Sequence, residues 1–162
     1  SELGTGTTMC LYLPRYFGAV EEQTETNMRT DMGHGAGETV LVVDDEPLLR
    51  MLILDVLTES GYQTIEAHDG PSALKILDSD VRIDLLVTDV GLPGGLNGRQ
   101  VADAARGRRP GLKVLFITGY AENAVVGNGY LAPGMAVVTK PFEISTFGQK
   151  VREMIETRSP AT

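Results

Sequence analysis

The chain has 162 residues, of which 42% are hydrophobic and 22% are charged, which is the balance of one globular domain with some chain to spare. This composition excludes disorder throughout the chain. No stretch approaches the about 20 apolar residues that cross a bilayer, so a membrane span is excluded as well. The formal net charge of −8 repels nucleic-acid phosphates and anionic lipid, so we expect no nucleic-acid partner and no membrane contact by this segment. A single cysteine, Cys10, is typical of a reducing compartment, and we expect the cytoplasm.

The first 37 residues differ in composition from the rest. Thr7 to Leu13 is a β-prone run that Pro14 ends, and it would be a strand with no partner in this chain. The segment from Gly18 to Gly37 is rich in Thr, Glu and Gly without apolar periodicity, which predicts a linker. Because the chain begins at Ser1 and not at Met, we expect that it was processed or cut from a longer protein.

After the linker, short apolar runs alternate with amphipathic segments. Continuous apolar runs indicate strands that are covered on both faces. We predict five strands: Thr39–Val43, Gln63–Ala67, Leu85–Thr88, Val114–Thr118 and Ala136–Thr139.

The intervening segments predict helices. The first runs from Pro47 to before Ser60 and has Leu48, Met51, Leu52, Val56 and Leu57 at helical spacing. The others are placed near Pro71–Leu77, Gly98–Arg106, Ala121–Val126 and Glu143–Glu156. A short basic run, Arg106, Arg108 and Arg109, is typical of a helix end that contacts terminal carbonyls.

Strands and helices that alternate in this way predict a doubly wound α/β domain with a five-stranded parallel sheet and helices on both faces. The flavodoxin-like strand order 2-1-3-4-5 is the expected topology.

Ligands of such sheets bind beyond the carboxyl ends of the strands, so the residues that end each strand are informative. The first strand ends in Asp44 and Asp45, the third in Asp89, the fourth in Thr118 and the fifth in Lys140. Singly, each has an ordinary interpretation, such as a helix N-terminus, a turn or a surface lysine. Together they would place three carboxylates, a hydroxyl and an ammonium on one edge.

Carboxylates gathered so closely repel one another, and holding them ionised calls for a cation, for which Mg²⁺ is suited. One carboxylate could then be the nucleophile towards a phosphoryl group. Lys140 would neutralise charge on the transferred group, and the Thr118 hydroxyl could donate a hydrogen bond to it.

These residues resemble the receiver domain of two-component response regulators, over roughly residues 39 to 157. Val43 to Pro47 is similar to the acidic pair of the family, Asp89 with Pro93 to its phosphoacceptor junction, and Lys140-Pro141-Phe142 to its lysine motif with a cis Lys-Pro bond. The resemblance implies that Asp89 is the phosphoacceptor, with Lys140 and Thr118 as its catalytic partners. It also implies Mg²⁺ bound by Asp44, Asp45, Asp89 and the backbone carbonyl of Gly91.

Two departures affect the expected switch. The family often has an aromatic residue where this chain has Val137, and Tyr120, two residues after Thr118, could replace part of it. The segment from Gly127 to Gly134 is rich in helix breakers, which favours a short or mobile helix before the fifth strand.

A weaker resemblance concerns the amino terminus, where Ser1 to Thr8 followed by Leu11 to Pro14 resembles the last glycine motif and final strand of a histidine-kinase ATP-binding domain. The expected organisation is therefore a kinase remnant at 1–16, a flexible linker at 17–37, a receiver domain at 38–158 and a tail at 159–162. This would be the carboxyl-terminal receiver of a hybrid sensor histidine kinase.

The predicted function is to accept a phosphoryl group from a kinase phosphohistidine onto Asp89, in cis or in trans, to hydrolyse it slowly and to switch a protein-binding face. A downstream histidine phosphotransfer protein and a second copy of the chain are the further partners considered. Two alternatives stay open: a pseudo-receiver that regulates by contact without being phosphorylated, and a free-standing single-domain regulator. His34 and His68 are not on a long helix and are interpreted as surface residues.

Overall fold

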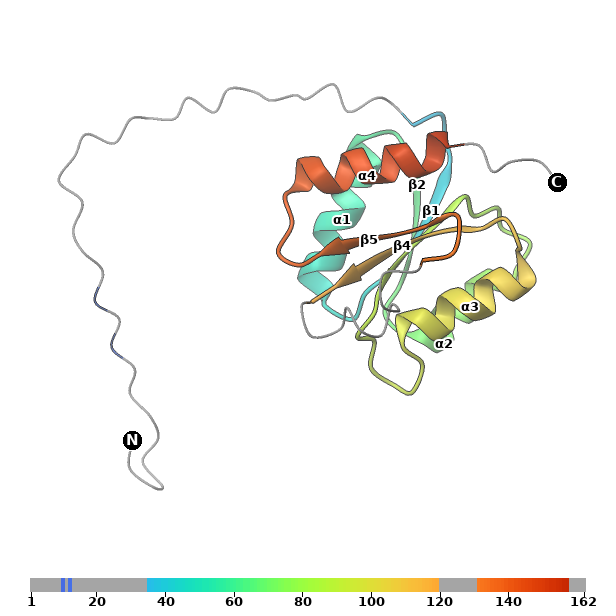
Figure 1. The fold of residues 1–162 in the computed structure, drawn as a ribbon, viewed down its shortest axis with the longest axis horizontal. Coiled ribbons are helices and arrows are strands. Elements are labelled where there is room, and N and C mark those ends of the chain that lie inside the picture. Colours follow the sequence, from blue (N-terminus) through green and yellow to red (C-terminus); the bar gives the residue numbers. More distant parts are fainter. Residues whose placement is uncertain (1–9, 11, 13–34, 120–130, 158–162) are drawn as a thin grey trace.

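The structure is a computed structural model that describes residues 10, 12, 35–119 and 131–157. The described residues from 35 onwards form one sheet covered by helices on both sides (Figure 1). Within these ranges, no helix is both long enough and apolar enough to cross a membrane.

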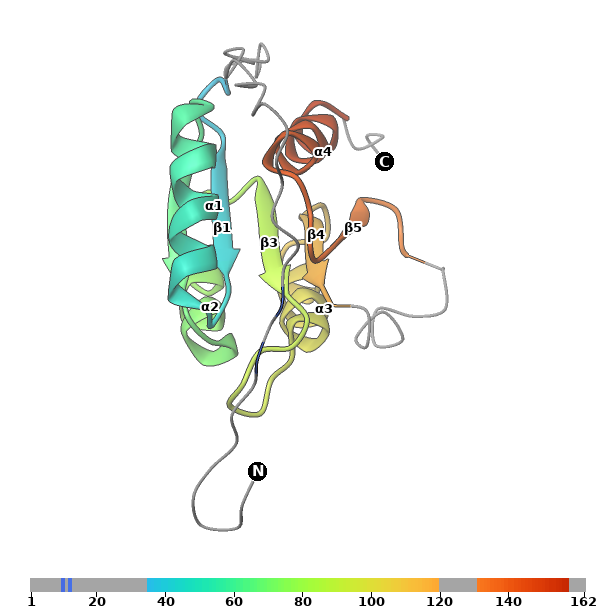
Figure 2. The same cartoon turned by 90° about the vertical axis from the view of Figure 1, so that its left-hand side faces the viewer.

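The sheet has five parallel strands in the order β2-β1-β3-β4-β5, as predicted. Their bounds are β1 Thr39–Val43, β2 Gln63–Ala67, β3 Leu85–Asp89, β4 Lys113–Thr118 and β5 Met135–Thr139. Three strands exceed the prediction by one residue, and the extension of β3 makes Asp89 its last residue. In Figure 2 the arrowheads of β1, β3 and β4 point the same way, so the carboxyl ends of these strands share one edge.

Four described helices cover the sheet: α1 Pro47–Glu59, α2 Gly70–Leu77, α3 Gly98–Arg108 and α4 Ile144–Glu156. α1 and α4 lie on one face, and α2 and α3 lie on the other (Figure 1). Successive residues of a strand point to opposite faces, so Leu41 and Val43 belong to the core under α2 and α3, while Val40 and Val42 belong to the core under α1 and α4. Because both faces of the strand are buried, every residue from Val40 to Val43 is apolar.

Local signals fix where α2 and α3 begin. Asp69 and Asn97 each accept a hydrogen bond from the backbone N–H three residues on, at 2.7 and 2.9 Å, and complete a capping box with Ser72 and Gln100. These bonds satisfy N–H groups that have no partner within the helix.

The buried face of α1 differs from the predicted stripe. Val56 and Leu57 are buried, together with Ile53. Leu48, Met51 and Leu52 are instead exposed by 72%, 56% and 44%. They lie on the opposite side of a helix that turns about 100° per residue, and Leu49 packs against the sheet in their place. An apolar surface therefore faces outwards from the first two turns of α1.

The basic run at the end of α3 contacts carbonyls, as predicted, but mainly those of the last residue of α2 and of the loop that follows it. Arg109 donates to the carbonyl oxygens of Leu77, Ser79 and Val81, and Arg108 pairs with Asp78. The end of α3 thus holds the end of α2, which makes these two helices one layer.

Several predictions lie outside the described residues: the helix at 121–126, Tyr120, His34 and nearly all of residues 1–34. Cys10 and Tyr12, the two described residues of the amino-terminal run, are exposed and are not in a strand.

Candidate functional site

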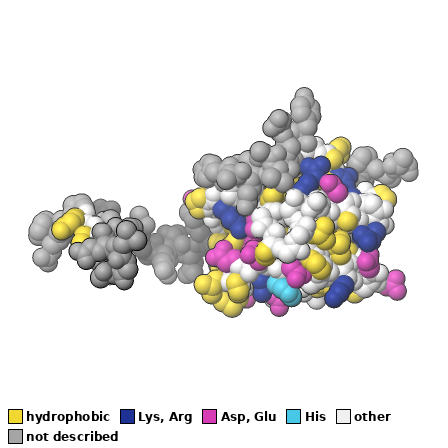
Figure 3. Space-filling view, turned by 90° about the horizontal axis from the view of Figure 1, so that it is seen from below, with side chains coloured by type: hydrophobic (Ala, Val, Ile, Leu, Met, Phe, Trp, Pro, Cys, Tyr) yellow, Lys and Arg dark blue, Asp and Glu magenta, His cyan; other side chains and the backbone are white. Residues whose placement is uncertain are grey.

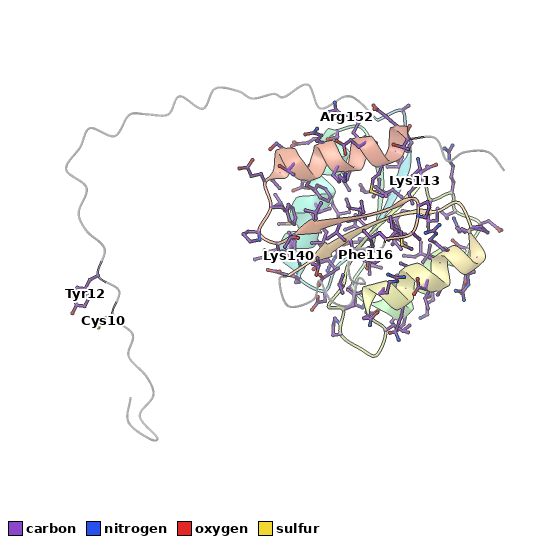
Figure 4. The ribbon with its side chains drawn as sticks, in the orientation of Figure 1. Cys10, Tyr12, Lys113, Phe116, Lys140 and Arg152 are labelled. Atoms are coloured by element: carbon purple, nitrogen blue, oxygen red, sulfur yellow. The ribbon has the colours of Figure 1, made fainter. Side chains whose placement is uncertain are left out.

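The carboxyl edge of the sheet brings together the charged residues that end its strands. Seen from below, the surface of the domain carries acidic, basic and hydrophobic side chains side by side (Figure 3). Lys140 lies at this end of the sheet and Lys113 at the opposite end (Figure 4). The positions of these two lysines in Figure 4 agree with the parallel pairing of β4 and β5.

Asp44 and Asp45 follow β1, where the chain turns into α1. Asp44 is almost completely buried at 1% exposure, whereas Asp45 is exposed. The Asp44 carboxylate accepts a hydrogen bond from the Glu46 N–H at 2.8 Å, which fixes the Asp44 side chain beside the N-terminus of α1. The acidic pair therefore presents one ordered, sheltered carboxylate and one that solvent reaches.

Asp89 and Lys140 complete the cluster from the middle and the far side of the sheet. Asp89 is 7% exposed at the end of the central strand β3. The Lys140 Nζ lies 3.4 Å from the Asp89 Oδ1 and 3.5 Å from the Asp44 Oδ2. The Lys140–Pro141 peptide bond is cis, as the resemblance implied. One ammonium thus bridges two carboxylates that are 45 residues apart in the sequence.

Burial and charge act against each other at this cluster. Burial is the main reason that the pKa of the Asp44 carboxyl is raised, although the Glu46 N–H and Lys140 partly oppose it. Burial also lowers the pKa of the Lys140 ammonium, but the neighbouring Asp44 and Asp89 outweigh it, so that pKa lies above its usual value. The ammonium therefore stays charged at neutral pH.

The other predicted residues lie around the same edge, with one outside the described part. Thr118 ends β4 and is fully buried, with its hydroxyl donating to the Gly119 carbonyl at 3.0 Å. The Lys140 N–H donates to the Thr118 carbonyl at 2.8 Å, so these two positions are joined by the backbone. Gly91 is exposed in the loop after β3, and Val137 is half-buried in β5. Tyr120 lies outside the described residues.

Two residues that support the cluster were not predicted. Gly98 begins α3 directly against Asp89: a Cβ atom at this position would overlap the Asp89 carbonyl oxygen and lie 2.8 Å from the Thr88 Oγ1. Arg50, one turn into α1, donates to the Asp44 carbonyl at 2.7 Å. The helix cap at Asn97 and Gly98 could have indicated the role of Gly98. No local pattern in the sequence indicates the role of Arg50.

The donor set fits a hard divalent cation. One carboxylate oxygen from each of Asp44, Asp45 and Asp89 lies within 4.8 Å of the others. Oxygen ligands in this number are those that Mg²⁺ takes while keeping positions for water or phosphate oxygens. The residues present therefore match the expected metal.

Comparisons with known proteins agree with this geometry. Residues 40–152 match the response regulator receiver domain family. The sensor kinase CckA of Brucella abortus is 32% identical over 96% of this chain, which spans 17% of that protein.

Two solved structures share the fold. A response regulator receiver protein from Sinorhizobium medicae has a TM-score of 0.70 and 29% identity, covering 76% of this chain and 98% of its own. The response regulator TrrA of Thermotoga maritima in complex with Mg(2+)-BeF has a TM-score of 0.61 and 28% identity, covering 72% of this chain and 98% of its own. With its fold, its acidic edge and its sequence in agreement, the chain belongs to the response regulator receiver domain family.

Proposed function

We propose that this chain is a phosphoacceptor, in which Asp89 takes a phosphoryl group from a kinase phosphohistidine with the help of Mg²⁺. The observation that carries the proposal is the position of the Lys140 ammonium, 3.4 Å from Asp89 and 3.5 Å from Asp44 at the edge where the three aspartates meet. A lysine held there can neutralise charge on a group that is transferred to either carboxylate.

The transfer is a displacement at phosphorus. A carboxylate oxygen of Asp89 forms the new O–P bond while the N–P bond of the phosphohistidine breaks, and the bond electrons return to the imidazole nitrogen. Asp44, Asp45, Asp89 and the Gly91 carbonyl would hold the metal, which supplies positive charge against the phosphoryl oxygens when bound. Lys140 pairs with an oxygen of the transferred group, and Thr118 turns its hydroxyl from the Gly119 carbonyl towards another.

Asp89 is the best placed of the three aspartates to accept the group. It ends the central strand β3, between the acidic pair after β1 on one side and Thr118 of β4 on the other. Asp44 is more deeply buried and accepts the Glu46 N–H, while Asp45 is exposed on the outer side. A phosphoryl group on Asp89 would therefore lie within reach of both the acidic pair after β1 and Thr118 of β4.

Phosphorylation would then act as a switch. Movement of Thr118 towards the new group would be transmitted along β4 and β5, with Val137 and Tyr120 at the positions that respond. Val137 is half-buried in β5, two residues before the end of that strand. The expected output is a change in the protein that binds the surface near β4 and β5. That partner would be a histidine phosphotransfer protein or a second copy of the chain.

We further propose that the chain is the carboxyl-terminal part of a hybrid histidine kinase, with a kinase remnant at 1–16, a linker at 17–37, the receiver at 38–158 and a tail at 159–162. The similarity to CckA supports this because it extends over 96% of the chain. The kinase histidine would be phosphorylated by ATP, so we expect the transfer to take place in the cytoplasm. A free-standing regulator is the second candidate, favoured by the receiver protein from Sinorhizobium medicae, of which 98% is covered.

The test is to incubate the chain with acetyl phosphate and MgCl₂ and to measure its intact mass. We expect a gain of one phosphoryl group that is absent in EDTA and absent in Asp89→Asn. Asp55→Asn is the matched control, because Asp55 is exposed on α1 away from the cluster. An unmodified wild type that folds and binds Mg²⁺ would instead support the pseudo-receiver, which regulates by contact alone.

A further inference from the structure

Arg50 is a charged residue in a sheltered place beside the acidic pair. It is the fourth residue of α1, and its side chain is only 16% exposed. Arginine is seldom this buried unless its guanidinium has partners. Here the Nη1 donates to the Asp44 carbonyl at 2.7 Å, and the Nε donates to the Glu66 Oε2 at 2.9 Å.

The carbonyl that Arg50 binds belongs to the peptide between the two acids. β1 ends at Val43, so the Asp44 carbonyl lies beyond the last residue of the strand. Because a peptide unit is planar, a donor that fixes the Asp44 oxygen also fixes the N–H of Asp45 and the direction in which its Cα leaves. The orientation of both carboxylates thus depends on this peptide.

The second partner of Arg50 anchors the guanidinium to the sheet. Glu66 lies on β2 and pairs with Val42 of β1, next to the end of that strand. The bond between Arg50 and Glu66 is charge-assisted, and the planar fork of arginine can hold the carboxylate and the carbonyl together. Arg50 therefore links α1, the turn after β1 and the neighbouring strand.

Arg50 also differs from Lys140 in what it contacts. Lys140 approaches carboxylate oxygens of Asp44 and Asp89, which are the atoms that a metal would use. The hydrogen bond from Arg50 to Asp44 is to the main chain. This arrangement steadies the acidic pair without occupying a carboxylate ligand.

We propose that Arg50, held by Glu66, is a positioning residue for the metal site, because it fixes the Asp44–Asp45 peptide so that both carboxylates face the same cation. This inference rests on the proposed function, since it assumes that Mg²⁺ binds at the three aspartates.

Positioning and simple electrostatics predict opposite results. Removing a positive charge near the aspartates reduces repulsion of Mg²⁺, so a purely electrostatic role predicts tighter binding in Arg50→Met. A positioning role predicts weaker binding, because groups that orient metal ligands are typically worth about 10- to 100-fold in affinity.

The experiment is a calorimetric titration of the full chain with MgCl₂ at fixed ionic strength, with thermal unfolding in EDTA to confirm that each variant is folded. We expect Arg50→Met to raise the Kd for Mg²⁺ about 10-fold. Arg50→Lys keeps the charge but cannot hold both partners, so its Kd should also rise. Glu66→Gln leaves the bond from Arg50 to the Asp44 carbonyl in place, so its Kd for Mg²⁺ should rise less. This variant tests the proposal if Arg50→Met does not fold.

Arg82→Met is the matched control, because Arg82 pairs with Asp84 at 2.7 Å ahead of β3, at the opposite end of the sheet. Its Kd should stay within about twofold of wild type, which measures the effect of the changed net charge alone. The proposal is overturned if folded Arg50→Met binds Mg²⁺ as tightly as wild type or more tightly, or if Arg50→Lys is indistinguishable from wild type. Failure of the wild type itself to bind Mg²⁺ would instead remove the proposed metal site.

Discussion

Lys140 is the residue whose position decides the electrostatics of the site. Its ammonium is shared between Asp44 and Asp89, and its backbone is joined to Thr118. The charge that a phosphoryl group brings would therefore meet a cation that is already in place, without reorganisation.

Replacing Lys140 with Met should slow phosphorylation by acetyl phosphate on the order of 100-fold, because it removes this cation while keeping most of the length of the side chain. The rate is measured from the phosphorylated fraction by intact mass over time. Lys150→Met is the control, since Lys150 is a partly exposed residue of α4 that pairs with Glu153. Equal rates in both variants would exclude Lys140 from the chemistry.

Gly98 sets how closely α3 approaches Asp89. Gly98→Ala should destabilise the domain by about 1–3 kcal/mol and displace Asp89, because the added methyl group meets the Asp89 carbonyl. Gly107→Ala on the same helix has nothing within 4 Å of its Cβ and should stabilise the domain by up to about 1 kcal/mol. Urea unfolding measures both. Two variants of equal stability would show that α3 can move away at little cost.

At the scale of the elements, helix capping gives a pH dependence with a definite sign. Hydrogen bonds from the Ser72 hydroxyl and N–H lower the pKa of the Asp69 carboxyl, so the folded state prefers the ionised form. The stability this contributes is present above the unfolded pKa and is lost as the pH falls through the lower, folded pKa.

Asp69→Asn tests this, because asparagine also caps helices but does not ionise in this range. We expect wild type to be more stable than Asp69→Asn at neutral pH, with the difference shrinking as the solution is acidified below pH about 4. Asn97→Ala removes the uncharged cap of α3 and should cost about 1 kcal/mol at every pH. Unfolding in urea across a pH series provides both comparisons, and a difference for Asp69→Asn that grows with acid would be inconsistent with the depressed pKa.

The outward face of α1 offers a surface for a protein partner. Leu48, Met51 and Leu52 are exposed in the helix that follows the acidic pair, and contiguous apolar surface on a soluble domain commonly marks an interaction site. A phosphohistidine donor that reaches Asp89 must contact residues around this edge.

Met51→Glu should therefore slow phosphotransfer from a phosphorylated histidine kinase about 10-fold or more, while phosphorylation by acetyl phosphate stays unchanged. Val81→Glu is the control, because Val81 is likewise an exposed apolar residue, at 44% against 56% for Met51, but precedes β3 at the opposite end of the sheet. Both rates are followed by intact mass. If Met51→Glu slowed both donors equally, the residue would act on the site and not on docking.

At the scale of the molecule, the sequence predicts what depends on repeated local patterns. Apolar runs such as Thr39–Val43 are covered on both faces, so they predict buried parallel strands, and the residue after each run predicts the active edge. Strand order and the gathering of Asp44, Asp89 and Lys140 follow from the same regularity.

What could not be predicted depends on the rotation and approach of elements. Leu48 and Leu49 have the same hydropathy, so the sequence alone did not show which one faces the sheet. The bond from Arg50 to the Asp44 carbonyl and the contact between Gly98 and Asp89 join elements that only the packing brings together. Arg109 was expected at a helix end, but its carbonyl partners belong to α2 and the loop that follows it.

Phosphorylation of Asp89 is tested by identifying the residue that carries the phosphoryl group. The chain is incubated with acetyl phosphate and MgCl₂, treated with sodium borohydride, which reduces an acyl phosphate to an alcohol, and mapped by peptide mass spectrometry. We expect homoserine at position 89 and unmodified side chains at Asp44 and Asp45. Homoserine at another aspartate, or none in a chain that has gained a phosphoryl group, would contradict it.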